Sequence, residues 1–136
     1  MPGYDLRFNK AGRKDGSGKC TLVSGYSKVH LAIYEVREAE RPFLDHAEGL
    51  GCGYDHHSLN VDGFGHCSTY IAASNAINDD LQPFDWYKEM LLLGCVINDF
   101  PSAYTGSENR VTDFEDTNIA RSSTKFAWVR QLHHGS

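Results

Sequence analysis

The stretch YDHHSLNVDGFGHCSTYIAA, residues 54–73, predicts a β-hairpin and does most to decide the fold. Two extended runs, residues 54–61 and 66–73, flank the turn sequence DGFG. An Asp-Gly pair between two such runs is a strong hairpin signal, because it suits the tight turns that join neighbouring strands. We therefore expect two strands that are connected directly, without a helix between them.

Strands are also expected on the N-terminal side of this hairpin. Residues 4–9 alternate polar and apolar side chains, which is the pattern of a half-buried strand. A Gly-rich stretch then leads to a second short strand near residues 20–23, and residues 29–36 are expected to form a third, more apolar strand. Because strands are joined by hairpins as often as by helices, the fold class is α+β rather than doubly wound α/β.

Two helices are expected among these strands. Residues 38–48 have Pro42 in their first turns and apolar side chains at helical spacing, and Gly49 follows as a stop. Residues 83–93 form the second helix, which begins at a proline and is followed by another glycine. The rest of the chain reads as loops before a last strand or helix turn at residues 124–132.

The bulk properties indicate one small domain, residues 1–132, in a chain of 136 residues. The His-His-Gly-Ser end, residues 133–136, resembles a vector-encoded tail and is left out of functional reasoning. A formal charge of -5 without a clustered basic face argues against a nucleic-acid partner. No apolar run approaches the roughly 20 residues of a membrane span, and no signal peptide opens the chain. We therefore expect no membrane partner and a cytoplasmic location.

The four cysteines give no sign of a metal or redox site, because no two of them form a Cys-x-x-Cys pair. His56 and His57 are neighbours in an expected strand, so their side chains point to opposite faces and do not readily chelate one ion. The expectation is four reduced thiols, no metal and no cofactor.

The most unusual segment is residues 44–54, in which an expected helix ends in the carboxylate of Glu48 and a glycine-rich turn follows. Closely spaced glycines let the backbone approach a ligand. A carboxylate in the last helical turn lies near the negative end of the helix dipole, which raises its pKa toward the range of a general base, and a partly dry site acts in the same direction. Composition alone, with 18 acidic residues, favours a solvated surface glutamate instead.

Several blocks of the chain, spread over residues 2–104, resemble the gamma-glutamylcyclotransferase-like family in order and approximate spacing. The blocks are Pro2-Gly3-Tyr4-Asp5-Leu6-Arg7-Phe8-Asn9-Lys10, Asp15-Gly16-Ser17-Gly18-Lys19, Leu44-Asp45 with Glu48-Gly49, Gly53-Tyr54, Thr69-Tyr70-Ile71-Ala72, Trp86-Tyr87, and Leu93-Gly94-Cys95 with Pro101. The resemblance implies a closed or nearly closed mixed β-barrel with flanking helices and a substrate cavity at one end. It also places Glu48 on the family's catalytic glutamate.

The activity that the resemblance implies is cyclisation of a γ-glutamyl amino acid or a γ-glutamylamine to 5-oxoproline. Glu48 would take a proton from the α-ammonium of the substrate and return it to the departing amine. Ring closure is intramolecular, so neither a metal nor a covalent intermediate is required. Glu48 is expected to point into a concave pocket near the turn at residues 16–19. The residues expected to bind the substrate are Tyr54, Gly16, Ser17, Gly18 and Gly49.

Two of these assignments have structural alternatives. Tyr54 could bind the substrate or Glu48, or it could be a buried tyrosine with a local backbone partner. The Ser17-Gly18-Lys19 run resembles a phosphate loop only superficially, because Cys20 follows where Ser or Thr would stand. A turn of the barrel is the alternative for this segment.

The chain departs from the family in one respect, since it has no Tyr-Gly-Ser-Asn turn of the kind that holds the glutamyl group. Two other functional classes therefore stay open: an inactive small-molecule binding module on the same fold, and a structural or interaction protein with an open sheet edge. We expect residues 124–132 to fill the place of the family's first strand, from the same or a neighbouring subunit. Exchange of that strand would make the protein a homodimer.

Overall fold

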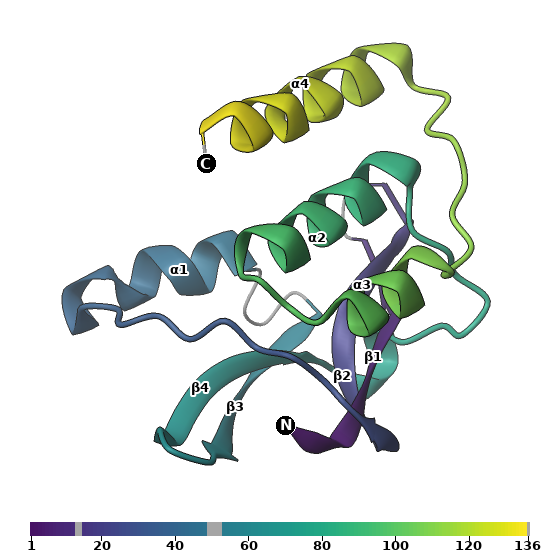
Figure 1. Ribbon diagram of the computed structural model, residues 1–136. Helices are drawn as coiled ribbons and strands as arrows, with labels where there is room; N and C mark the ends of the chain where they lie inside the picture. The colour runs from purple at the N-terminus through teal and green to yellow at the C-terminus, as the bar shows by residue number, and fades with distance from the viewer. Residues whose placement is uncertain (13–14, 49–52, 136) are drawn as a thin grey trace. The chain divides into compact units, whose positions relative to one another are not determined.

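The computed structural model in Figure 1 describes residues 1–12, 15–48 and 53–135, and the side chains of residues 47, 48 and 132–135 also lie outside the described part. Helices and antiparallel strands are mixed along the chain, so the expected α+β class is confirmed. The chain divides into two compact units, Met1–Leu81 and Gln82–Ser136. The single domain expected over residues 1–132 stays a prediction.

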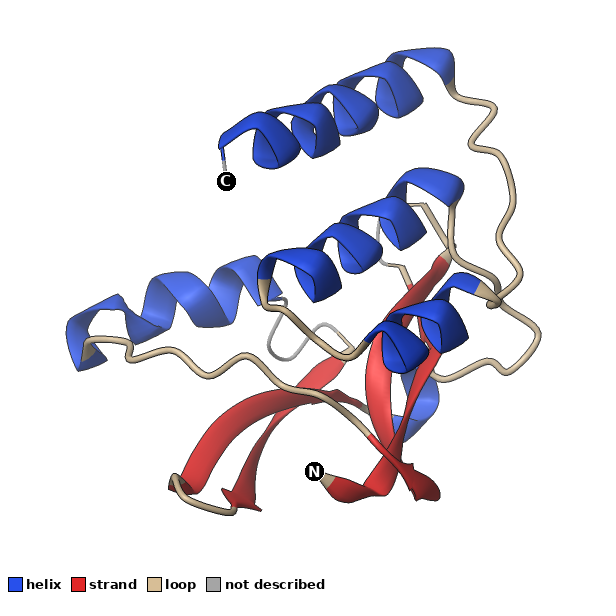
Figure 2. Cartoon of the chain, viewed as in Figure 1, coloured by secondary structure: helices blue, strands red, loops and turns tan. Residues whose placement is uncertain are grey.

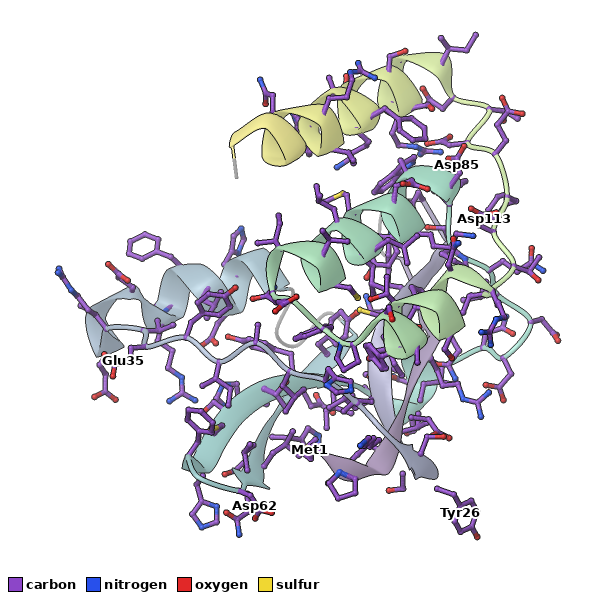
Figure 3. The ribbon with its side chains drawn as sticks, viewed as in Figure 1. Met1, Tyr26, Glu35, Asp62, Asp85 and Asp113 are labelled. Atoms are coloured by element: carbon purple, nitrogen blue, oxygen red, sulfur yellow. The ribbon has the colours of Figure 1, made fainter. Side chains whose placement is uncertain are left out.

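The first unit begins with a hairpin of two long antiparallel strands, β1 (Pro2–Ala11) and β2 (Gly18–Lys28). Both strands contain the segments expected from the sequence and extend beyond them. The turn is closed by a hydrogen bond of 2.8 Å from the Gly12 N–H to the Ser17 carbonyl. At the open end of β2, Tyr26 points away from the hairpin into solvent (Figure 3).

The second hairpin of the first unit consists of β3 (Tyr54–Val61) and β4 (Gly65–Ala72). Its antiparallel register pairs Val61 with Gly65 at the turn and continues without interruption to the far end. Gly63 and Gly65 have φ angles of 84° and 72°, which explains why the turn sequence is rich in glycine. The hairpin expected at residues 54–73 is confirmed.

The described strands form two separate two-stranded sheets, because backbone pairing joins β1 to β2 and β3 to β4. The closed barrel that the resemblance implies is therefore not observed among them. Two other hydrogen bonds join the hairpins of this unit: the Ala72 N–H donates to the Thr21 Oγ1 (2.9 Å) and the Tyr54 hydroxyl donates to the Cys20 carbonyl (2.8 Å).

The third strand expected at residues 29–36 is wrong, since this segment forms neither helix nor strand. Its first residue, Val29, is buried and exchanges hydrogen bonds with the backbone of Met1, but the apolar side chains at positions 32, 33, 34 and 36 are exposed. Tyr34 and Val36 are 75% and 48% accessible. An apolar run predicts a strand only where a neighbouring strand supplies backbone partners, and none pairs with this segment among the described residues.

The helix expected at residues 38–48 is confirmed, including its last residue. A short 3-10 helix, Glu38–Glu40, leads into α1 (Arg41–Glu48). Pro42 is tolerated here because the N–H groups of the first helical turn need no partner within the helix.

In the second unit, the described residues are helical apart from their connections, as the blue segments of Figure 2 show. The expected helix at residues 83–93 is present as α2 (Asp85–Ile97), but it continues past Gly94. The helix ends instead at Ile97. Two residues on, Asp99 has a left-handed φ of 54°, and the N–H groups of Asp99 and Phe100 donate to the Val96 and Cys95 carbonyls. The stop expected at Gly94 is therefore wrong.

Two further helices stand where the sequence predicted mainly loops. α3 (Ser102–Asn109) follows Pro101, and α4 (Ile119–Gly135) includes residues 124–132, for which the sequence predicts a strand or a helix turn. The strand alternative for residues 124–132, and with it the strand expected to fill the barrel, is wrong for this structure.

The core of the second unit is aromatic and is organised around one buried carboxylate. Phe84, Trp86 and Phe114 pack with ring centroids 4.6 to 5.9 Å apart. The Trp86 Nε1–H donates to Asp116 (2.9 Å), and the guanidinium of Arg121 binds both oxygens of the same carboxylate at 2.6 and 2.7 Å. These contacts attach α4 to the start of α2.

Candidate functional site

The residue expected to be catalytic, Glu48, is the last residue of α1. Its side chain, and the whole of Gly49, lie outside the described residues. The helix end that the sequence predicted is therefore confirmed, whereas the expectation that the carboxylate points into a pocket stays a prediction.

Tyr54 begins β3 directly after Gly53, whose φ of 112° favours glycine. The Tyr54 hydroxyl donates to the backbone carbonyl of Cys20, and the Lys10 ammonium lies 4.5 Å from the centroid of the ring. The hydrogen bond to the Cys20 carbonyl corresponds to the structural alternative for Tyr54, in which the hydroxyl binds a backbone group rather than the substrate. The hydroxyl thus fixes the second hairpin against β2, and a role in substrate binding stays a prediction.

The turn that contains Gly16, Ser17 and Gly18 is held together by the carboxylate of Asp15. Its Oδ1 accepts hydrogen bonds from the Ser17 N–H (2.9 Å) and hydroxyl (2.7 Å), and its Oδ2 lies 3.2 Å from the Lys19 ammonium. Burial acts to raise the pKa of Asp15, but the hydrogen bonds from Ser17 and the charge of Lys19 outweigh it and leave the pKa below its usual value. The polar groups of this turn are thus largely satisfied within the turn.

A cavity of about 610 Å³ lies elsewhere in the first unit. Its wall combines the irregular segment after β2, the start of α1, and both strands of the second hairpin. The lining residues are Leu31, Ala32, Ile33, Tyr34, Val36, Glu38, Arg41, Leu44, His56, Leu59, Val61, His66, Cys67, Ser68, Thr69 and Tyr70. Neither Tyr54 nor residues 16–18 line this cavity, so the structure does not bring them together with it.

Four polar side chains form a connected network at the junction of α1 with the second hairpin. One nitrogen of Arg41, Nη2, lies 2.7 Å from Nδ1 and 2.9 Å from Nε2 of His56. The Tyr70 hydroxyl donates to the Asp45 carboxylate, which is 4.0 Å from the His56 Nε2, and the rings of His56 and Tyr70 meet edge to face. The network therefore joins residues from α1, β3 and β4.

Arginine has donors only, so a ring nitrogen of His56 can only accept in its contact with Arg41. Both nitrogens lie within hydrogen-bond distance of Arg41 Nη2, and which of them accepts depends on the tautomer of the ring.

The sequence predicted a pocket near Tyr54 and residues 16–19 but not the cavity observed here, and it did not predict this network, although two signals for the network were available. His56 faces Tyr70 in the register that the hairpin turn fixes, and cross-strand partners are close neighbours. Arg41 and Asp45 are four residues apart in α1, which places them on one side of the helix. What the sequence did not show is that α1 would meet the second hairpin.

Comparisons with protein-family models, curated proteins and solved structures found no match to this chain. Within residues 1–12, 15–48 and 53–135, no helix is long and apolar enough to cross a membrane. The same described part contains no group of three or more His, Cys, Asp or Glu side chains that could hold a metal ion.

Proposed function

We propose that this chain is a γ-glutamylcyclotransferase-like enzyme that converts a γ-glutamyl amino acid or γ-glutamylamine into 5-oxoproline and a free amine. The single observation that carries the proposal is that α1 ends at Glu48 while Arg41 and Leu44 of the same helix line the cavity. Positions 41, 44, 45 and 48 follow one another along one face of an α-helix. We propose that one substrate molecule contacts both the Glu48 carboxylate and the cavity.

In the proposed reaction, the Glu48 carboxylate removes a proton from the α-ammonium of the substrate. The neutral nitrogen then attacks the γ-carbonyl carbon, the bond from that carbon to the leaving nitrogen breaks, and Glu48 returns the proton to the departing amine. Atoms and charge balance without a co-reactant. Because nucleophile and electrophile belong to one molecule, correct positioning supplies much of the acceleration.

The proposal includes a barrel in which the two hairpins of the first unit lie side by side. The hydrogen bonds from Tyr54 to Cys20 and from Ala72 to Thr21 support it, since they join β2 to the second hairpin. In such a barrel, the cavity walls contributed by β3 and β4 would face the barrel interior.

A second candidate function is small-molecule binding without chemistry. The observation that favours it is the state of the expected substrate-binding groups: the Tyr54 hydroxyl donates to a backbone carbonyl, and the Ser17 hydroxyl donates to Asp15. A substrate would have to compete with these contacts, whereas a ligand of the cavity would not.

The experiment that separates the two candidates is direct detection of 5-oxoproline. The purified chain is incubated with γ-glutamyl amino acids and γ-glutamylamines, and the product is quantified by mass spectrometry. A Glu48→Gln variant keeps the shape of the side chain but cannot shuttle the proton, so we expect product formation to fall by at least about 100-fold. Thermal stability should be nearly unchanged.

The matched control for this variant is Glu40→Gln, which removes an exposed carboxylate from the 3-10 helix before α1. We expect it to retain full activity. A Glu48→Gln enzyme that kept most of its rate would exclude the acid/base role, and an absence of product with every substrate would leave binding as the better account.

A further inference from the structure

The cavity gathers large apolar side chains that stay accessible. Ile33, Val36 and Leu44 are 39%, 48% and 36% exposed and all line it, together with the buried Leu59. Accessible apolar surface that collects in one hollow marks a binding site more often than a random exposed residue does. The volume of about 610 Å³ also lies within the usual range of small-molecule sites.

The charged groups of the wall restrict what can bind there. Among the lining residues that the structure describes, Glu38 and Arg41 are those with a carboxylate or a guanidinium. Arg41 uses Nη2 for His56, and its Nε and Nη1 groups have no hydrogen-bond partner within the described part of the chain. A guanidinium with two such N–H groups can donate a pair of parallel hydrogen bonds to the two oxygens of a carboxylate.

The nearby anion and the aliphatic wall define the rest of the ligand. A second carboxylate inside the cavity would meet the negative charge of Glu38, two residues after Val36 and three before Arg41. The wall also carries polar side chains, among them Ser68 and Thr69, so the case for an apolar body rests on the aliphatic side chains that such a body would cover and remove from water. The part of a ligand that the cavity fits therefore has one carboxylate and an apolar body.

We propose that the cavity binds the leaving half of the substrate and selects an amino acid with an apolar side chain, whose carboxylate is bound by Arg41. This inference rests on the proposed cyclotransferase function and narrows it from γ-glutamyl compounds in general to γ-glutamyl amino acids such as γ-glutamyl-leucine. A γ-glutamylamine lacks the carboxylate, and γ-glutamylglycine lacks the apolar side chain, so each loses one of the two interactions.

Three substrates test the two interactions separately. γ-Glutamyl-leucine carries both groups, γ-glutamyl-isopentylamine has the same carbon skeleton without the leucine carboxylate, and γ-glutamylglycine keeps the carboxylate alone. The measured quantity is kcat/KM for 5-oxoproline release. We expect γ-glutamyl-leucine to exceed each of the other two by about 10-fold or more, which is the size expected for a charge-assisted hydrogen bond or a buried aliphatic group.

An Arg41→Gln variant tests the assigned residue. We expect it to lower kcat/KM for γ-glutamyl-leucine by about 10-fold, mostly through KM, and to change kcat/KM for γ-glutamyl-isopentylamine by less than about threefold. The matched control is Arg37→Gln, because Arg37 is exposed on the same segment and does not line the cavity. Equal losses for both substrates, or an equal loss in the control, would overturn the assignment.

Failure of this inference can be distinguished from failure of the proposed function. Isothermal titration calorimetry of the Glu48→Gln protein with the same three compounds measures binding in the absence of turnover. If no compound yields 5-oxoproline, the cyclotransferase function is wrong, yet tighter binding of γ-glutamyl-leucine that depends on Arg41 still supports the assigned ligand. If the three compounds bind with equal affinity, or none binds, the inference is wrong whatever the activity.

Discussion

The ionisation of the Asp116 carboxylate depends strongly on the groups that surround it. The carboxylate is buried and accepts hydrogen bonds from Trp86, from the Arg121 guanidinium and from the Asn118 N–H. The bonds from Arg121 contribute most, and together with the other donors they overcome the effect of burial and hold the pKa of Asp116 well below its ordinary value of 3.8. The folded state therefore favours the ionised form.

The sign of the resulting pH dependence follows from linkage. Between the lowered pKa of the folded state and the ordinary value of 3.8, the unfolded chain binds more protons at Asp116 than the folded chain does. The stabilisation is therefore complete above the unfolded value and is lost as the pH falls toward the folded one.

We predict that Asp116→Asn lowers the free energy of unfolding by about 2–3 kcal/mol at pH 7. The variant should also lose less stability than the wild type between pH 5 and pH 3, because it lacks the titrating group. Urea unfolding across this range measures both effects. The matched control is Asp113→Asn, which removes a partly exposed partner of Lys88 (Figure 3) and should cost less than about 1 kcal/mol. If the free energy of unfolding fell by the same amount between pH 5 and pH 3 in the Asp116→Asn variant and the wild type, the role of Asp116 would be contradicted.

At the scale of elements, the sequence predicted the helices and strands that are marked by turn, proline or glycine residues at their own ends. The hairpin at residues 54–73 follows from its DGFG turn, and α1 follows from Pro42 near its start and Gly49 after its end. The C-terminal segment is ambiguous in the sequence because its apolar residues form one short run, residues 126–129, whose spacing does not distinguish a strand from a helix. In the structure, the less exposed positions of α4 are residues 121, 122, 125, 126, 127 and 129, and all of them except residue 127 recur at helical spacing.

The elements that the sequence missed depend on contacts or on competing end signals. Residues 29–36 have a strand-like composition, yet no strand pairs with them in the described part of the chain. The end of α2 was placed at Gly94, whereas the left-handed Asp99 and the carbonyl contacts around it terminate the helix. α3 begins directly after Pro101, which the sequence predicts to be a loop residue although proline is also common at helix starts.

Gly94 provides a test of the longer α2 helix. A Cβ atom built at this position meets no atom within 4 Å, and the residue is flanked by helical turns on both sides. We predict that Gly94→Ala stabilises the protein by about 0.5–1 kcal/mol, because alanine has a higher helix propensity. Thermal unfolding of the variant measures the change. A neutral or destabilising result would indicate that the helix ends near Gly94, as the sequence suggested.

At the scale of the whole molecule, the candidate site divides into a part that sequence could predict and a part that it could not. Glu48 at a helix end is a local feature and was predicted. The cavity is assembled from the segment after β2, from α1 and from the second hairpin, which are separate in the chain. The groups that we propose to bind the ligand, Arg41 and the aliphatic side chains, are recognisable only once those three segments are brought together.

The conformation of the C-terminal segment also changes what is expected of the assembly. The sequence suggested a strand at residues 124–132 that two copies of the chain could exchange, but the segment is helical as part of α4. Within the second unit, the Lys125 ammonium lies 5.1 Å from the Trp86 ring centroid and 4.2 Å from that of Trp128. The contact between Lys125 and Trp86 gives α4 an intramolecular packing role against α2.

We predict that truncation after Ser123 lowers the melting temperature and leaves the oligomeric state unchanged. The truncation removes Lys125 and Trp128, and cation–π contacts of this kind contribute about 0.5–2 kcal/mol each. It keeps Arg121 and therefore the ion pair with Asp116. Calorimetry measures the first effect, and sedimentation equilibrium of the full and truncated chains measures the second. A full-length dimer that dissociates or aggregates when the segment is removed would restore strand exchange as the explanation, because loss of an intramolecular helix does not alter the number of chains in the assembly.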